Sequence, residues 1–168
     1  FAQAGSIGMF ADDAGTSCNV MDSAAGLCNM YVVFVHHGGI TGAQFQCPVP
    51  ACMGAQYMSW SSPWGVAIGD PVVGDPTSCA IGTGSCQPAP TLLGTLSFFC
   101  QATTPSCCYY PILPAEGIVS GMLEGVDCDF NPTFPTGGEA VVNPIAGCEC
   151  DVPTHDTTWG QVKALFEK

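Results

Sequence analysis

The sequence predicts an all-β protein: a disulfide-rich antiparallel β-sandwich in residues 1–156, followed by a short helical C-terminal tail at 157–168. Three observations predict this class. Short apolar runs alternate with Gly, Pro, Asp and Ser along most of the chain, which is typical of strands joined by tight turns. The 21 glycines and 14 prolines disfavour long helices. Twelve cysteines in 168 residues indicate a framework of disulfides.

The first three strands are expected at residues 6–11, 27–36 and 42–48. The second contains the longest apolar run, at residues 30–35, which has the length of a strand and is far shorter than the roughly 18–20 residues of a membrane helix. Gly38-Gly39 reads as the turn between the second and third strands. No membrane span is therefore expected.

Six further strands are expected at residues 57–60, 66–68, 91–100, 108–113, 118–123 and 139–143. Gly69-Asp70-Pro71 and Gly74-Asp75-Pro76 are typical turn sequences. Residues 82–90 are rich in small side chains and are expected to form a loop. The chain has neither an internal repeat nor a composition shift that would indicate a second sandwich domain.

The last twelve residues have a different pattern. Thr158-Trp159-Gly160-Gln161 matches a capping box, in which a Thr side chain and a Gln three residues later satisfy the first helical amides. The residues expected to mediate assembly are an apolar helical face and one cation: Trp159, Val162, Leu165, Phe166 and Lys163. A helix of about ten residues is marginal alone. The tail is therefore expected to pack on its own sandwich or on the acidic face of a neighbouring subunit.

The cysteines indicate an oxidising compartment, so a secreted protein of the extracellular space or cell surface is expected. The start, Phe1-Ala2-Gln3-Ala4, is consistent with a processed terminus after a signal peptide. No Cys-x-x-Cys occurs, which argues against zinc ribbons and thioredoxin-type sites. Near pairs such as Cys18–Cys28, Cys47–Cys52 and Cys79–Cys86 are plausible local bridges. All twelve are expected in disulfides: Cys18, Cys28, Cys47, Cys52, Cys79, Cys86, Cys100, Cys107, Cys108, Cys128, Cys148 and Cys150.

Charge excludes one large class of partners. Lys163 is the first cation of the chain, and all fourteen acidic residues except Glu167 lie in residues 1–156. Such a surface cannot neutralise phosphates, so nucleic-acid binding is not expected. Charged residues make up 10% of the chain, against about 25% in ordinary domains. The surface is therefore neutral, or it is covered by other subunits or by O-linked glycans, since Asn131-Pro132-Thr133 is not an N-glycosylation acceptor.

Acidic clusters offer candidate Ca²⁺ ligands. Asp127-Cys128-Asp129-Phe130-Asn131 begins like a calcium loop with alternating oxygen ligands, but Pro132 occupies the position of the turn glycine. An irregular site would use Asp127, Asp129 and Glu124. The alternative interpretation is that these residues form turns.

Catalytic motifs are missing from the sequence. It contains no Gly-x-Ser-x-Gly, no His-Glu-x-x-His and no phosphate loop, and it lacks arginine for anionic substrates. Neither His36-His37 nor His155-Asp156 has an evident nucleophile. We therefore do not expect an enzyme. Tyr57, Trp60 and Trp64 form a candidate sugar-stacking platform, although such aromatics equally suit a core.

Three stretches carry a resemblance: IGMFAD at 7–12, residues 31–36 with TGAQF at 41–45, and TTWGQVKALF at 157–166. Together they resemble small, cysteine-rich secreted proteins of environmental bacteria. The strand followed by Gly-Ala-Gln-Phe is also similar to that of cohesin sandwiches. The resemblance implies secretion and an immunoglobulin-like or cohesin-like sandwich, and it brings no catalytic residues to this chain.

Two functions fit these features. The first is an extracellular structural subunit that binds copies of itself and forms a filament, sheath or surface layer, with Ca²⁺ as a candidate bridge between acidic faces. The alternative is a monomeric secreted binding module, cohesin-like or carbohydrate-binding. Low charge and the amphipathic tail favour the first function.

Overall fold

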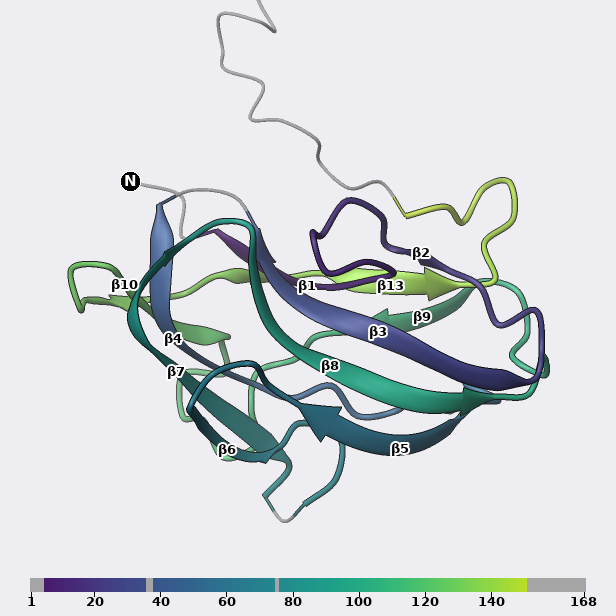
Figure 1. Cartoon of the computed structure of the whole chain (residues 1–168), viewed down its shortest axis with the longest axis horizontal. Coiled ribbons are helices and arrows are strands. Elements are labelled where there is room, and N and C mark those ends of the chain that lie inside the picture. Colours follow the sequence, from purple (N-terminus) through teal and green to yellow (C-terminus); the bar gives the residue numbers. More distant parts are fainter. Residues whose placement is uncertain (1–4, 36–37, 75, 151–168) are drawn as a thin grey trace, which may run out of the picture.

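The computed structural model describes residues 5–35, 38–74 and 76–150 (Figure 1). These residues form thirteen strands and no helix, so the all-β prediction is confirmed for the part of the chain described. No helix in this part is long and apolar enough to cross a membrane. The predicted C-terminal helix, and with it the division at residue 157, lies outside the described residues.

Three sheets build the sandwich. The β3–β8 sheet contains, in spatial order, β12 (Thr136–Gly137), β1 (Ser6–Phe10), β3 (Gly26–Val35), β8 (Thr91–Cys100) and β5 (Gln56–Ser61). The β4–β7 sheet contains β11 (Pro132–Thr133), β10 (Glu124–Asp127), β4 (Gly39–Phe45), β7 (Ser78–Pro88) and β6 (Val66–Asp70). A smaller sheet contains β2 (Asn19–Val20), β13 (Glu139–Val142) and β9 (Cys108–Pro111). All pairings are antiparallel except β1 with β12 and β2 with β13.

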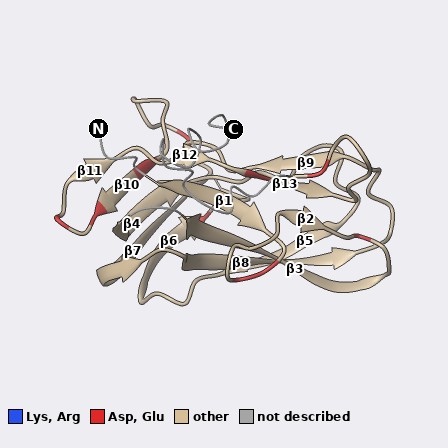
Figure 2. Ribbon diagram, turned by 90° about the horizontal axis from the view of Figure 1, so that it is seen from above, with Lys and Arg blue, Asp and Glu red and all other residues tan. Residues whose placement is uncertain are grey.

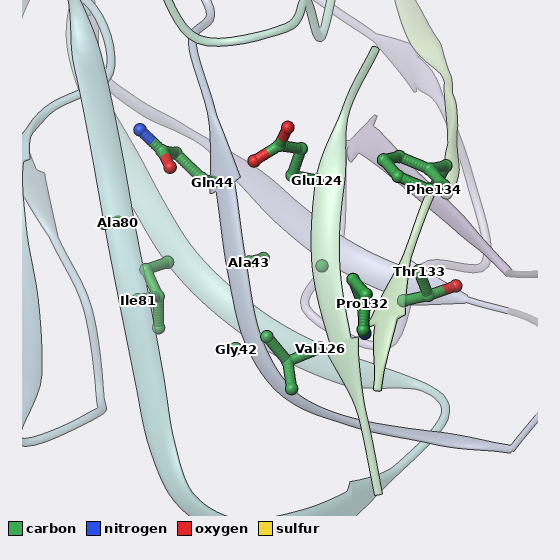
Figure 3. A pocket seen from close by; sticks show the side chains of 11 residues that line it. Gly42, Ala43, Gln44, Ala80, Ile81, Glu124, Val126, Pro132, Thr133 and Phe134 are labelled. Atoms are coloured by element: carbon green, nitrogen blue, oxygen red, sulfur yellow. The ribbon is translucent and has the colours of Figure 1, made fainter. Parts of the chain in front are cut away.

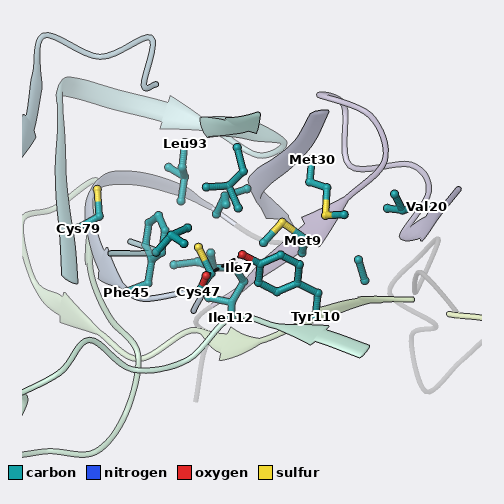
Figure 4. Close-up of a cluster of buried hydrophobic side chains, with 14 of the residues drawn as sticks. Ile7, Met9, Val20, Met30, Phe45, Cys47, Cys79, Leu93, Tyr110 and Ile112 are labelled. Carbon is teal, nitrogen blue, oxygen red and sulfur yellow. Dashed lines mark hydrogen bonds between the residues drawn. The ribbon is translucent and has the colours of Figure 1, made fainter. Parts of the chain in front are cut away.

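The main core lies between the sheets, because alternate side chains of each strand point inward. Val32 and Phe34 of β3 and Phe45 of β4 are buried members of this core, and Figure 4 shows Phe45 within the cluster. The ring of Tyr110 from β9 contacts Phe98 edge to face, with centroids 6.1 Å apart. The Tyr110 hydroxyl donates a hydrogen bond of 2.8 Å to the carbonyl oxygen of Cys47, so its polar end is satisfied inside the core.

A second, smaller core covers the outer face of the β3–β8 sheet. Phe10, Val33 and Val35 point away from the main core and are buried by the loop that follows β1. Asp12 shapes this loop, because its carboxylate accepts hydrogen bonds from the amides of residues 14, 16 and 17. Cys150 packs on this cluster and is bonded to Cys18. The described chain therefore ends on the outside of the β3–β8 sheet.

The structure confirms a sandwich cross-linked by disulfides, but the predicted number of disulfides and their predicted pairing are wrong. The described residues include all twelve cysteines, of which ten are bonded and two, Cys47 and Cys79, are free and buried. The bridges are Cys18–Cys150, Cys28–Cys100, Cys52–Cys108, Cys86–Cys128 and Cys107–Cys148. The predicted local bridges Cys18–Cys28, Cys47–Cys52 and Cys79–Cys86 are wrong.

Strand register explains the error in the disulfides. Cys28 lies opposite Phe98 in the β3–β8 pair, two residues from Cys100, so the sheet brings together cysteines that are 72 residues apart. The shortest bridge still spans 41 residues. Sequence proximity is therefore a poor guide, because the bonded cysteines are brought together by contacts between distant parts of the chain.

Two predicted elements also need correction. The expected loop at 82–90 is mostly strand, since β7 continues to Pro88 and pairs with β4 as far as Gly39. The expected strand at 118–123 consists of turns, because Gly117 and Gly121 have φ angles of 84° and 64°, which reverse the chain. The neighbouring strand is β10, which begins at Glu124. The other predicted strands overlap observed ones.

Candidate protein-binding face

The outer face of the β4–β7 sheet exposes large apolar side chains beside a row of small residues. Strand register places its outward side chains in two rows across β6, β7, β4 and β10. One row is Val66, Gly82, Gly42 and Val126. The next row is Ile68, Ala80, Gln44 and Glu124. Apart from Gln44 and Glu124, every member of these rows is apolar or glycine.

The β6 side of this face presents large apolar side chains to solvent. Val66 is 55% exposed and Ile68 is 69% exposed. Next to them, Gly82 and Ala80 of β7 and Gly42 of β4 leave the middle of the face almost free of side chains. Contiguous exposed apolar surface is rare on monomeric proteins, and it often marks a site of interaction with another protein.

A groove of about 320 Å³ runs beside these residues, between β7 and β11 (Figure 3). Its lining includes Gly42, Gln44, Ala80, Glu124, Val126, Pro132 and Phe134. Phe134 is 46% exposed and lies on the β11 side. The volume is at the lower end of the ~300–1,000 Å³ range of ligand pockets, which suits one or two inserted side chains. Glu124 is the only ionisable residue among the residues that line the groove.

Local packing distinguishes the two glycines in the floor. A Cβ atom at Gly42 would lie 3.0 Å from the carbonyl oxygen of Ile81, so this position is crowded. A Cβ atom at Gly82 would lie 3.6 Å from Val66, which is an ordinary contact. The fold therefore has room for a side chain at residue 82, and the glycine there keeps the floor open.

One carboxylate, that of Glu124, lines the groove on the β10 side. Glu124 accepts a hydrogen bond of 2.9 Å from the hydroxyl of Ser120, which orients it. Asp127 and Asp129 follow at the end of β10 and in the next turn. Figure 2 shows acidic positions at this end of the molecule and no lysine or arginine anywhere in the described residues. A partner of this face would therefore meet negative charge that is not neutralised from within.

The residues of the predicted calcium site lie in β10 and in the turn that follows it. Asp127 closes the turn after β10: its Oδ1 accepts hydrogen bonds from the amides of Asp129 at 2.9 Å and Asn131 at 2.8 Å. Within residues 5–35, 38–74 and 76–150, no group of three or more His, Cys, Asp or Glu side chains is arranged to hold a metal ion. The hydrogen bonds of Asp127 agree with the turn-forming interpretation, and the calcium site at Asp127, Asp129 and Glu124 stays a prediction.

The aromatic residues Tyr57, Trp60 and Trp64 are partly buried residues that pack against the main core. Tyr57 stacks edge to face on Phe98, and its hydroxyl donates a hydrogen bond of 2.6 Å to Asp70. Trp60 packs on the main core, and the Trp64 indole donates a hydrogen bond to a backbone carbonyl oxygen. The three residues are partly buried and pack against the main core, which agrees with the core interpretation, and sugar binding by them stays a prediction.

Two cysteines that were expected in disulfides are buried free thiols. Cys47 and Cys79 both lie in the main core with no exposed surface. Burial, followed by the nearby Cys79, raises the pKa of Cys47 well above its usual range. Burial and the Asp70 carboxylate raise the pKa of Cys79 to about 12. Both side chains are therefore protonated thiols at neutral pH, which react slowly with electrophiles.

The remaining predicted site residues lie outside the described part of the chain. They are the tail residues Trp159, Val162, Lys163, Leu165 and Phe166, together with the three histidines. The groove itself was not predicted. Its sequence signal is weak, because Val66-Ala67-Ile68 has the same alternation as a half-buried strand and the glycines read as loop residues.

Comparison with solved structures identifies the fold as a cohesin-like β-sandwich. The third ScaB cohesin of R. flavefaciens, solved in complex with a group 1 dockerin, matches with a TM-score of 0.53 and 11% identity, over 84% of this chain and 96% of that one. A cohesin module from a Clostridium perfringens family 33 glycoside hydrolase matches with a TM-score of 0.52 and 10% identity, over 86% and 100%. A non-cellulosomal cohesin from the hyperthermophilic archaeon Archaeoglobus fulgidus matches with a TM-score of 0.52 and 11% identity, over 84% and 91%.

The likeness is structural only. No protein-family model matches the sequence, and no curated protein matches it. At identities near a tenth, the comparison establishes the fold and nothing finer. The expected cohesin-like sandwich is thus confirmed, and the five disulfides add the signature of an oxidising, extracellular environment.

Proposed function

We propose that this chain is a secreted protein-binding module whose binding surface is the outer face of the β4–β7 sheet. The observation that carries the proposal is the pairing of exposed Val66 and Ile68 with a floor of glycine and alanine. A partner could place one or two apolar side chains on this floor. Burying the exposed parts of two such residues would contribute about 1–3 kcal/mol to binding.

The rim indicates the charge of the partner. Glu124 lines the groove, Asp127 ends β10 and Asp129 lies in the turn that follows, and the described residues hold no cation that could pair with them. A partner that brings lysine or arginine to this rim would bind with electrostatic complementarity, which mainly raises the rate and specificity of association. The fold supports the proposal, since the R. flavefaciens cohesin that it resembles was solved with a bound dockerin.

A library of displayed random peptides, selected on the whole protein, tests the proposal even though the partner is unidentified. We expect enriched peptides that combine apolar residues with Lys or Arg. Their binding should be lost on Ile68→Glu and retained on Leu27→Glu. Leu27 is a matched control, because it is also an apolar strand residue, 77% exposed, and lies outside the β4–β7 sheet. Peptides that bind equally to both variants would show that this face is not the binding surface.

A further inference from the structure

We propose that the partner of this face is a second copy of the chain, and specifically that residues 157–168 of one copy occupy the outer face of the β4–β7 sheet of the next. This inference rests on the proposed function, because it needs the same face to bind protein. It would join copies head to tail.

The first argument is where the chain leaves the sandwich. Cys150 is bonded to Cys18, and its amide donates a hydrogen bond of 2.9 Å to Asn19. Both contacts hold residue 150 against the small core on the outer face of the β3–β8 sheet. The groove is on the outer face of the other main sheet, and Figure 2 shows β3 and β8 on the opposite side of the molecule from β10 and β11.

Chain length makes the neighbouring groove the simpler destination. Eighteen residues follow Cys150. Fully extended they would span at most about 60 Å, but ten of them in a helix would span only about 15 Å. A tail that leaves one face can reach the groove of a copy stacked on that face directly, whereas its own groove requires a path around the sandwich edge.

The second argument is charge. Residues 157–168 contain both cations of the protein, Lys163 and Lys168, and a single carboxylate, Glu167. Residues 1–156 contain all the other Asp and Glu residues of the protein and have no Lys or Arg. The same sequence therefore contains an acidic face and a cationic segment. Such charge complementarity is expected when copies of one chain bind each other.

The third argument is the apolar pattern. Trp159, Val162 and Phe166 recur at spacings of three and four, with Leu165 beside them, so a helix would present them along one side. The face offers apolar Val66 and Ile68 on β6 and Phe134 beyond β10, with the open floor between them. An amphipathic segment in an apolar groove is a recurring mode of peptide recognition. Because groove and tail are different surfaces, the contact is heterologous and extends into chains unless the rotation closes a ring.

Two variants that each remove one half of the contact test this inference. Ile68→Glu places a charge on the binding face and leaves the tail unchanged. The double variant Trp159→Asp with Phe166→Asp places charges on the apolar side of the tail and leaves the face unchanged. By sedimentation velocity, we expect wild type to form concentration-dependent oligomers and each blocking variant alone to be a 17.3 kDa monomer. A mixture of the two blocking variants should contain a dimer of twice that mass, because one intact face meets one intact tail.

Other outcomes separate the two proposals. A monomeric wild type at all concentrations, or a mixture that forms no dimer, overturns head-to-tail assembly. If displayed peptides still bind in a manner sensitive to Ile68→Glu, the face binds a different protein and the proposed function stands. If neither the peptides nor the oligomers depend on Ile68, both proposals fail. Circular dichroism of Ile68→Glu checks its fold, which should be intact because this side chain is largely outside the core.

Discussion

At the residue scale, a buried carboxylate holds the loop between β8 and β9. Asp22 is 3% exposed, and its oxygens accept hydrogen bonds from the amides of Ala102 at 2.8 Å and Thr104 at 3.1 Å. Asn143 completes the network, since its amide group donates to Thr104 and its Oδ1 accepts from the Asp22 amide. Burial alone would raise the pKa of Asp22, but the hydrogen bonds from Thr104 and its neighbours outweigh it and lower the pKa.

This lowered pKa predicts an acid-sensitive contribution to stability. The unfolded carboxyl group, with a pKa of about 3.9, binds a proton at higher pH than the folded one, so the contribution is complete above that pH and is lost as the pH falls through the folded pKa. We expect Asp22→Ala to lower the free energy of unfolding by about 1–3 kcal/mol at neutral pH, because two buried amides lose their acceptor. Denaturant unfolding at several pH values should show this difference shrinking below about pH 4. A difference independent of pH would contradict the assignment.

The buried thiols give a second prediction at this scale. We expect the native protein to resist a thiol-alkylating reagent, since Cys47 and Cys79 have no exposed surface and are protonated. After unfolding without reductant, mass spectrometry should find two alkylated cysteines and ten that remain in disulfides. An unfolded protein with no reactive thiol would instead mean that Cys47 and Cys79 are bonded to each other.

At the scale of the element, strand β7 has a glycine, Gly82, at a position where the fold has room for a side chain. Glycine inside a strand lowers stability by about 0.5–1 kcal/mol relative to alanine. Because a Cβ atom at Gly82 makes only ordinary contacts, we expect Gly82→Ala to stabilise the protein by up to this amount. The bulkier Gly82→Val should weaken peptide binding several-fold by filling the floor.

Gly94 of β8 provides the contrasting control for this strand prediction. A Cβ atom there would collide with the ring of Trp60, so Gly94→Ala should destabilise the protein even though it makes the same chemical change. Thermal unfolding of the two alanine variants compares them directly. Equal shifts in the same direction would show that the close packing at Gly94 and the open space at Gly82 are not as described.

Sequence patterns predicted the strands better than their partners. Short apolar runs bounded by turn residues located β3, β4 and β8. They could not give the register that unites Cys28 with Cys100 or that leaves Cys47 free, since this depends on contacts far apart in the chain. The same limit hid the candidate face, because nothing in the sequence distinguishes the exposed apolar side of β6 from a buried one.

At the scale of the whole molecule, the disulfides differ in the length of chain that they close. Cys18–Cys150 spans 132 residues and also fixes the end of the described chain, whereas Cys107–Cys148 spans 41. Loop entropy predicts that serine replacement of the longer pair lowers the free energy of unfolding by about 3–5 kcal/mol, and that replacement of the shorter pair lowers it by about 1 kcal/mol less. Guanidinium unfolding of the two double-serine variants measures both values. The reverse order would show that local strain or residual structure, rather than loop length, decides the contribution.

The central claim is that the outer face of the β4–β7 sheet binds protein, and calorimetric titration of one selected peptide tests it most directly. The peptide is titrated in parallel into wild type, Ile68→Glu and Leu27→Glu. We predict binding at least about tenfold weaker for Ile68→Glu, equivalent to about 1.4 kcal/mol, and unchanged affinity for Leu27→Glu. Equal affinities for wild type and Ile68→Glu, or a loss confined to Leu27→Glu, would contradict the claim.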